Sequence, residues 1–127
     1  MSFYVLGISC FFHDSSATLI KDGDIVAAVQ EERFTRKKND SSFPVNSINY
    51  CLTSRNISLN KISSVVYYEK PLLTFERLLE TYLATAPRGL RSFIRAMQIW
   101  IKQKLYLKSN IKKELFSIQK NLFPSEK

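Results

Sequence analysis

Three short apolar runs near the amino terminus, separated by polar turns, constrain the fold of this chain more than any other feature. The runs are residues 3–6, 17–20 and 25–29. Short runs rich in β-branched and aromatic residues, bounded by turn residues, are typical of strands. Asp22 and Gly23 form the kind of connection that joins two antiparallel strands. The pattern therefore predicts an antiparallel three-stranded meander at the start of an α/β fold.

The rest of the chain predicts further elements in a fixed order. Pro44 is followed by apolar residues at helical spacing, which predicts a helix beginning at this proline or just after it. Residues 62–68 are β-branched and aromatic, and they predict a fourth strand. A helical carboxy-terminal half is predicted after that, with segments over residues 72–84, 90–107 and onward to Phe116 and a break at 87–89.

Charge is divided unequally along the chain, which carries a net charge of +8. Residues 1–70 hold 8 Lys/Arg against 7 Asp/Glu, whereas residues 71–127 hold 11 against 4. A basic helical segment with interleaved aromatics is also typical of a nucleic-acid or anionic-membrane surface. We favour packing against a partner or a missing part of the protein over nucleic-acid binding, because apolar residues recur there at helical spacing. These residues are Leu90, Phe93, Ile94, Met97, Ile101 and Leu105.

The few histidine and cysteine residues limit the metal sites and disulfides that this chain can form. His13 is the sole histidine, and Cys10 and Cys51 lie far apart, so no metal site of ordinary ligand spacing is expected. Two cysteines without a framework spacing suggest free thiols and a cytoplasmic setting. No signal peptide is evident, and no apolar stretch is long enough to span a bilayer.

The turn after the first predicted strand is the candidate site. We expect Ser9, His13, Asp14, Ser15 and Ser16 to lie in a β-hairpin loop. Small hydroxyl side chains and free backbone N–H groups suit an anionic ligand, and histidine can titrate near neutral pH. The alternative is an ordinary surface pair in a turn whose polar residues serve local hydrogen bonding.

Three blocks in order, HDSSA, QEERFTRKK and FPVNSINYCL, carry a resemblance to a known family. The sequence resembles the start of the carbamoyltransferases that include nodulation-factor and antibiotic O-carbamoyltransferases. The resemblance implies an amino-terminal domain of the actin-like ATPase (ASKHA, ribonuclease H-like) superfamily. It also implies a two-step reaction. A YrdC-like domain makes carbamoyl-adenylate from carbamoyl phosphate and ATP, and the amino-terminal domain passes the carbamoyl group to an acceptor hydroxyl.

The resemblance assigns roles to residues of the first two blocks. His13 is the expected catalytic residue, and Asp14 would orient it or hold a metal-bound water. Ser15 and Ser16 would support the loop or touch phosphate. Basic side chains of the second block would line the path of a nucleotide or carbamoyl phosphate. They are Arg33, Arg36, Lys37 and Lys38, of which we weight Arg36 and Lys37 most. The alternative is that these basic residues are solvated surface charges, with Glu31 and Glu32 as their partners at the surface.

Members of this family are several times longer than 127 residues. We therefore interpret residues 1–127 as a truncated amino-terminal domain, with a meander, helix and strand over 1–70 and a basic helical segment over 71–127. The resemblance implies ATP, carbamoyl phosphate and iron only for the full-length protein, with a histidine-rich metal motif beyond this chain. We expect the fragment alone to be inactive. The alternatives are a binding or scaffolding module that completes a partner chain, and an ATPase half-domain.

Overall fold

The computed structural model describes residues 2–122, and the chain divides into two compact units. Unit 1 takes in the chain up to Tyr68 and again from Glu114 onward. Unit 2 is Glu69–Lys113.

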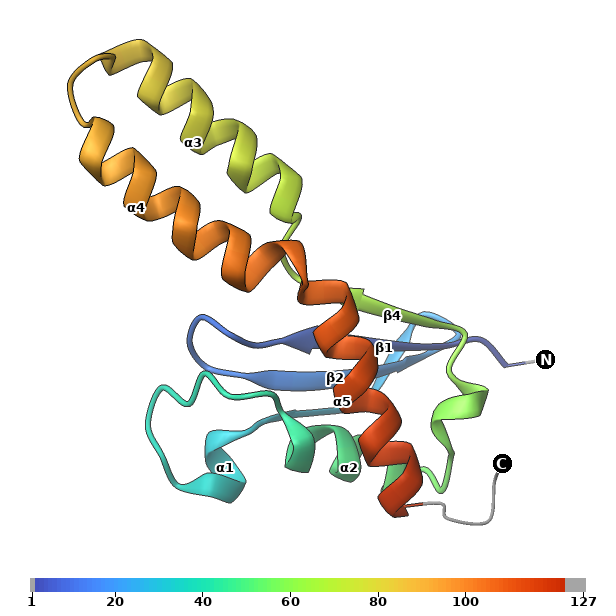
Figure 1. The fold of residues 1–127 in the computed structure, drawn as a ribbon. Coiled ribbons are helices and arrows are strands. Elements are labelled where there is room, and N and C mark those ends of the chain that lie inside the picture. The colour runs from blue at the N-terminus through green and yellow to red at the C-terminus, as the bar shows by residue number, and fades with distance from the viewer. Residues whose placement is uncertain (1, 123–127) are drawn as a thin grey trace. The chain divides into compact units, whose positions relative to one another are not determined.

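A four-stranded mixed sheet forms the framework of unit 1 (Figure 1). Its strands follow the order β3-β2-β1-β4. β1 pairs antiparallel with β2, β2 pairs antiparallel with β3, and β4 runs parallel to β1. The predicted meander and the fourth strand are thus confirmed. The strands are β1 (Tyr4–Ser9), β2 (Ser16–Lys21), β3 (Asp24–Gln30) and β4 (Ser64–Tyr67).

Alternate residues of the central strands build the core. Leu6 and Leu19 are fully buried and lie directly opposite each other in the β1–β2 ladder. α2 (Val45–Thr53) packs on β2 and β3, and its Ile48 and Leu52 are also fully buried. The helix begins directly after Pro44, as predicted, because proline fits the first turn of a helix.

Short helices and one longer helix complete unit 1. α1 (Glu32–Thr35) follows β3, and the 3₁₀ turn η1 (Leu59–Lys61) precedes β4. The carboxy-terminal part of α5 (Leu107–Leu122) belongs to this unit, where Ile118 is buried. The Gln119 side chain accepts a hydrogen bond of 3.0 Å from the Leu59 N–H, so α5 and the chain before β4 are joined.

Unit 2 contains an antiparallel helical hairpin of α3 (Pro71–Thr85) and α4 (Leu90–Trp100). The rings of Tyr82 and Phe93 stack with centroids 4.3 Å apart, and those of Phe75 and Trp100 are 5.0 Å apart. A π-helical stretch, Ile101–Leu105, follows α4 and interrupts the single long helix that was expected from Leu90 to Leu107. An ion pair between Glu69 and Lys104 also lies within this unit.

Candidate functional site

The loop that joins β1 to β2 is residues 10–15, one residue shorter at each end than expected. Ser9 and Ser16 are instead the last and first residues of the two strands and face each other in the ladder. Inside the loop, the Phe11 N–H donates to the Ser41 carbonyl and the Ser15 N–H to the Asp40 carbonyl, both at 2.8 Å. The connection between β3 and α2 therefore holds this loop by its backbone.

His13 and Asp14 form a pair at the exposed part of the loop. The His13 Nδ1 atom lies 2.9 Å from Asp14 Oδ2, and the two side chains are 59% and 40% exposed. Asp14 has a φ of 49°, a left-handed conformation that aspartate adopts more readily than most residues. Within the described residues the His13 ring has no second hydrogen bond or ion pair.

The two serines of the first block lie deeper than the His13–Asp14 pair. Ser15 is 1% exposed, and its hydroxyl has no hydrogen-bond partner among the described residues. Its carbonyl accepts a hydrogen bond of 2.8 Å from the Glu31 N–H. Ser16 belongs to β2 and is partly exposed. The backbone of Ser15 therefore connects the loop to Asp40 and Glu31.

Asp40 organises the connection that holds the loop. One of its carboxylate oxygens accepts hydrogen bonds from the Ser42 N–H and hydroxyl at 3.0 and 2.7 Å, and the other accepts one from the Thr35 hydroxyl at 2.8 Å. These hydrogen bonds to Ser42 and Thr35 lower the pKa of Asp40 to about 2. An ionised Asp40 thus fixes the backbone whose carbonyl receives the Ser15 N–H.

The basic residues of the second block lie in this same connection. Arg36, Lys37 and Lys38 are exposed, and Arg36 ends α1 with a φ of 55°. The positive charge of Lys37 contributes to the lowered pKa of Asp40. No hydrogen bond or ion pair joins the three basic side chains to His13 or Asp14 in residues 2–122. The connection that carries these basic residues therefore reaches the loop through the backbone of Asp40 and Ser41.

Glu31 does not pair with surface cations as expected, because it is buried beneath the connection. It is 2% exposed, and its carboxylate accepts four hydrogen bonds. Oε1 accepts from the Asn46 N–H and side-chain amide at 3.1 and 2.8 Å, and Oε2 from the Ser47 N–H and hydroxyl at 2.8 and 2.7 Å. Pro44, at the N-cap of α2, has no side-chain oxygen, so Glu31 caps this helix from a distance.

Glu31 and Asp40 support the loop but were not predicted as parts of the site. The sequence Asp-Ser-Ser at residues 40–42 carries a usable signal, since an aspartate often accepts a hydrogen bond from the residue two positions on. For Glu31 the sequence holds no such signal, because its partners follow 15 and 16 residues later.

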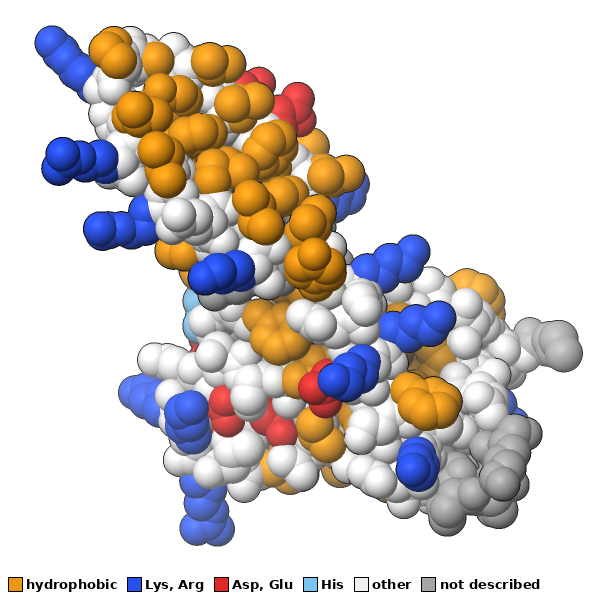
Figure 2. All heavy atoms as spheres, in the orientation of Figure 1, with side chains coloured by type: hydrophobic (Ala, Val, Ile, Leu, Met, Phe, Trp, Pro, Cys, Tyr) orange, Lys and Arg blue, Asp and Glu red, His pale blue; other side chains and the backbone are white. Residues whose placement is uncertain are grey.

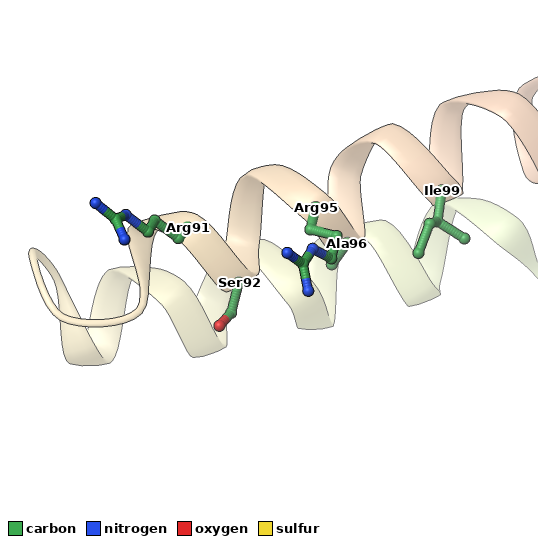
Figure 3. A pocket seen from close by; sticks show the side chains of 5 residues that line it. All are labelled: Arg91, Ser92, Arg95, Ala96 and Ile99. Carbon is green, nitrogen blue, oxygen red and sulfur yellow. The ribbon is translucent and has the colours of Figure 1, made fainter.

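The remaining features to consider are the cysteines, possible metal ligands, possible membrane spans and a hollow in unit 2. Cys10 and Cys51 are buried and form no disulfide, and burial raises the pKa of the Cys51 thiol to about 11. No group of three or more His, Cys, Asp and Glu side chains that could hold a metal occurs among the described residues. In that same part of the chain no helix is both long and apolar enough to cross a membrane. A hollow in unit 2 is lined by Arg91, Ser92, Arg95, Ala96 and Ile99, all from α4 (Figure 3).

The mixed sheet, with its histidine-bearing loop, defines an α/β domain. The family model described as Carbamoyltransferase N-terminus matches residues 4–123 of it. The chain therefore belongs to this carbamoyltransferase family, and the resemblance carried by the three sequence blocks is confirmed.

Individual relatives are similar over different lengths. The uncharacterized protein sll1178 of Synechocystis sp. is 67% identical over 112 residues, which are 88% of this chain and 18% of that protein. Nodulation protein NolNO of Sinorhizobium fredii is 43% identical over 58 residues, which are 46% of this chain and 8% of that protein. The uncharacterized protein MJ1051 of Methanocaldococcus jannaschii is 52% identical over 48 residues, 38% of this chain and 9% of that protein. The chain thus spans less than a fifth of each of these relatives.

Proposed function

We propose that this chain is the amino-terminal part of an O-carbamoyltransferase, and that loop 10–15 acts where the carbamoyl group passes to an acceptor hydroxyl. The observation that carries the proposal is the exposed His13–Asp14 pair on a loop whose backbone is fixed by Asp40 and Ser41. Fixed backbone and exposed side chains are what a group-transfer site requires, because the reacting groups must be positioned before the reaction.

In the proposed step His13 is the general base. In this step the Nδ1–H group donates to Asp14, which orients the ring, and Nε2 is the atom that takes the proton. The acceptor oxygen forms a bond to the carbamoyl carbon of carbamoyl-adenylate, the bond from that carbon to the phosphate oxygen of AMP breaks, and the hydroxyl proton goes to Nε2 of His13. The products are the carbamoylated acceptor and AMP.

The other residues take supporting roles in this proposal. Arg36, Lys37 and Lys38 offer positive charge to the phosphate oxygens of the donor. Ser15 holds the loop through its backbone, and Ser16 lies at the mouth of the β1–β2 hairpin beside it.

We further propose that the domain is part of an actin-like ATPase fold and is located in the cytoplasm. An antiparallel meander followed by a strand parallel to β1 supports the fold assignment. Two buried cysteines that form no disulfide support the location. The described residues do not fit an iron site, because no three potential ligands come together among them. We therefore assign no step in this chain to iron.

A hybrid protein tests the proposal. The matching segment of the Synechocystis relative is replaced by this chain, and the hybrid receives ATP, radiolabelled carbamoyl phosphate and a panel of sugar hydroxyl acceptors. Label is expected on an acceptor. His13→Ala is expected to abolish this transfer but to keep the carbamoyl phosphate-dependent exchange of pyrophosphate into ATP, since the adenylate is made elsewhere in our proposal. The chain alone is expected to give neither activity.

The matched control is Asp24→Ala, an exposed residue at the start of β3, where the strand leaves the Asp22–Gly23 turn. It is expected to transfer as the parent hybrid does. Full acceptor labelling by the His13→Ala hybrid, or labelling by the chain alone, would contradict the proposal.

A further inference from the structure

The helical hairpin of unit 2 carries a broad apolar face that is exposed to solvent. On α3 it contains Leu72, Leu79 and Leu83, which are 75%, 36% and 66% exposed. On α4 it contains Leu90 and Ile94, each 47% exposed. Spacings of four and seven residues place the members of each set in one row along their helix.

The two rows lie on the same side of the hairpin. The stacked rings of Tyr82 and Phe93 lie between the helices, and each is followed at once by a residue of the apolar face, Leu83 on α3 and Ile94 on α4. In two antiparallel helices, the residues that directly follow a pair of contacting residues point to the same side of the hairpin. Figure 2 shows the result as a continuous hydrophobic surface across the hairpin.

Opposite charges border this face on its two edges. Arg91 and Arg95 each follow a face residue of α4 by one position, and Figure 3 shows their guanidinium groups on one side of that helix. On α3, Glu80 follows Leu79 in the same way. Because Tyr82 lies opposite Phe93, Glu80 and Arg95 are at the same level of the hairpin, on opposite edges. In the part of the chain that the structure describes, neither has an ion-pair partner.

We propose that this face binds the same face of a second copy of the chain, forming a symmetric four-helix bundle. A twofold axis along the length of the hairpins would bring the apolar faces together. The same rotation would set Glu80 of each copy against Arg95 of the other, so both edges of the interface would be closed by opposite charges.

The charge pattern favours this occupant over an anionic bilayer or a nucleic acid. An anionic bilayer or a nucleic acid would attract the Arg91 and Arg95 edge but repel the Glu76 and Glu80 edge. A second copy satisfies both edges at once. The inference does not depend on the proposed function, because it uses residues of unit 2 only.

Sedimentation of the full 127-residue chain over a range of concentrations tests the proposal. A dimer is expected. Ile94→Asp should weaken dimerisation by at least about a hundredfold, since the substitution enters the centre of the interface twice. The matched control is Leu73→Asp, because Leu73 is also 47% exposed but lies in neither row of the face. It should leave the dimer intact, and circular dichroism checks that both variants are folded.

A charge exchange tests the predicted pairing directly. Arg95→Glu should weaken the dimer about tenfold, and adding Glu80→Arg should restore it to within about threefold of the wild type. Arg77→Glu, on another side of α3, makes the same charge change and should have no effect. A wild-type chain that stays monomeric would overturn the proposal, whether or not it binds phosphatidylglycerol vesicles. A dimer that responds equally to Ile94→Asp and Leu73→Asp, or is not rescued by the charge exchange, would also overturn it.

Discussion

Glu31 offers the sharpest test of how the candidate site is supported. Glu31→Ala removes the acceptor of the N–H groups of Asn46 and Ser47 and of the buried Ser47 hydroxyl. A buried donor left without a partner costs about 1–3 kcal/mol, and the loss of a helix cap costs about 1 kcal/mol. Water can reach the exposed Asn46, so the estimates do not simply add. We expect unit 1 to lose about 3 kcal/mol of unfolding free energy.

Amide hydrogen exchange is the appropriate assay because it reports unit 1 separately from unit 2. The Leu6 amide, in the central strand β1, should exchange about a hundredfold faster in Glu31→Ala, which corresponds to about 3 kcal/mol. Glu32→Ala is the control, since within the described residues the Glu32 carboxylate accepts one hydrogen bond, of 3.4 Å, from the Asn39 N–H. It should change the exchange rate by less than about fivefold. Equal rates in the wild type and Glu31→Ala would refute the assigned role of Glu31.

Three further predictions concern the surroundings of the loop. The pKa of Asp40 is about 2 in the folded chain against an ordinary value of 3.8, so its contribution to stability is complete above about pH 4 and is lost as the pH falls toward 2. Asp40→Asn lacks this contribution, so its acid denaturation should depend less steeply on pH than that of the wild type. An acid denaturation profile identical to the wild type's would contradict the assigned role of Asp40. The pKa of Cys51 is raised to about 11, so at pH 8 this thiol should react with a thiol reagent at least about tenfold more slowly in the native chain than in the unfolded chain. The reaction is followed by absorbance, and equal rates would disprove the burial of Cys51. Tyr67→Phe removes the 2.8 Å hydrogen bond to the Cys10 carbonyl and should cost about 1 kcal/mol in urea denaturation, whereas an unchanged midpoint would show that this bond contributes nothing.

Local patterns in the sequence predicted most of the elements. The meander, β4 and the start of α2 depend on period-two runs, the Asp22–Gly23 turn and Pro44, and these are features of neighbouring residues. The predicted ends of the β1–β2 loop each differed from the observed ends by one residue. Ser9 and Ser16 look like turn residues, but their backbone groups continue the ladder between β1 and β2.

Interactions between distant residues could not be predicted in this way. Glu31 was interpreted as a surface charge. The residues next to it in the sequence do not show that it caps α2, a helix that has no capping side chain of its own. The anchoring of the loop by the carbonyls of Asp40 and Ser41 is a backbone contact, and any residue types could have made it. The π-helical stretch after α4 likewise has no counterpart in the spacing of apolar residues.

A structure with the donor bound would test the central claim most directly. The Synechocystis relative carrying this chain in place of its matching segment would be crystallised with a non-hydrolysable analogue of carbamoyl-adenylate and an acceptor. We predict that Nε2 of His13 lies within about 3.2 Å of the acceptor oxygen, with Nδ1 still bonded to Asp14. An analogue bound at a site that loop 10–15 does not contact would contradict the account.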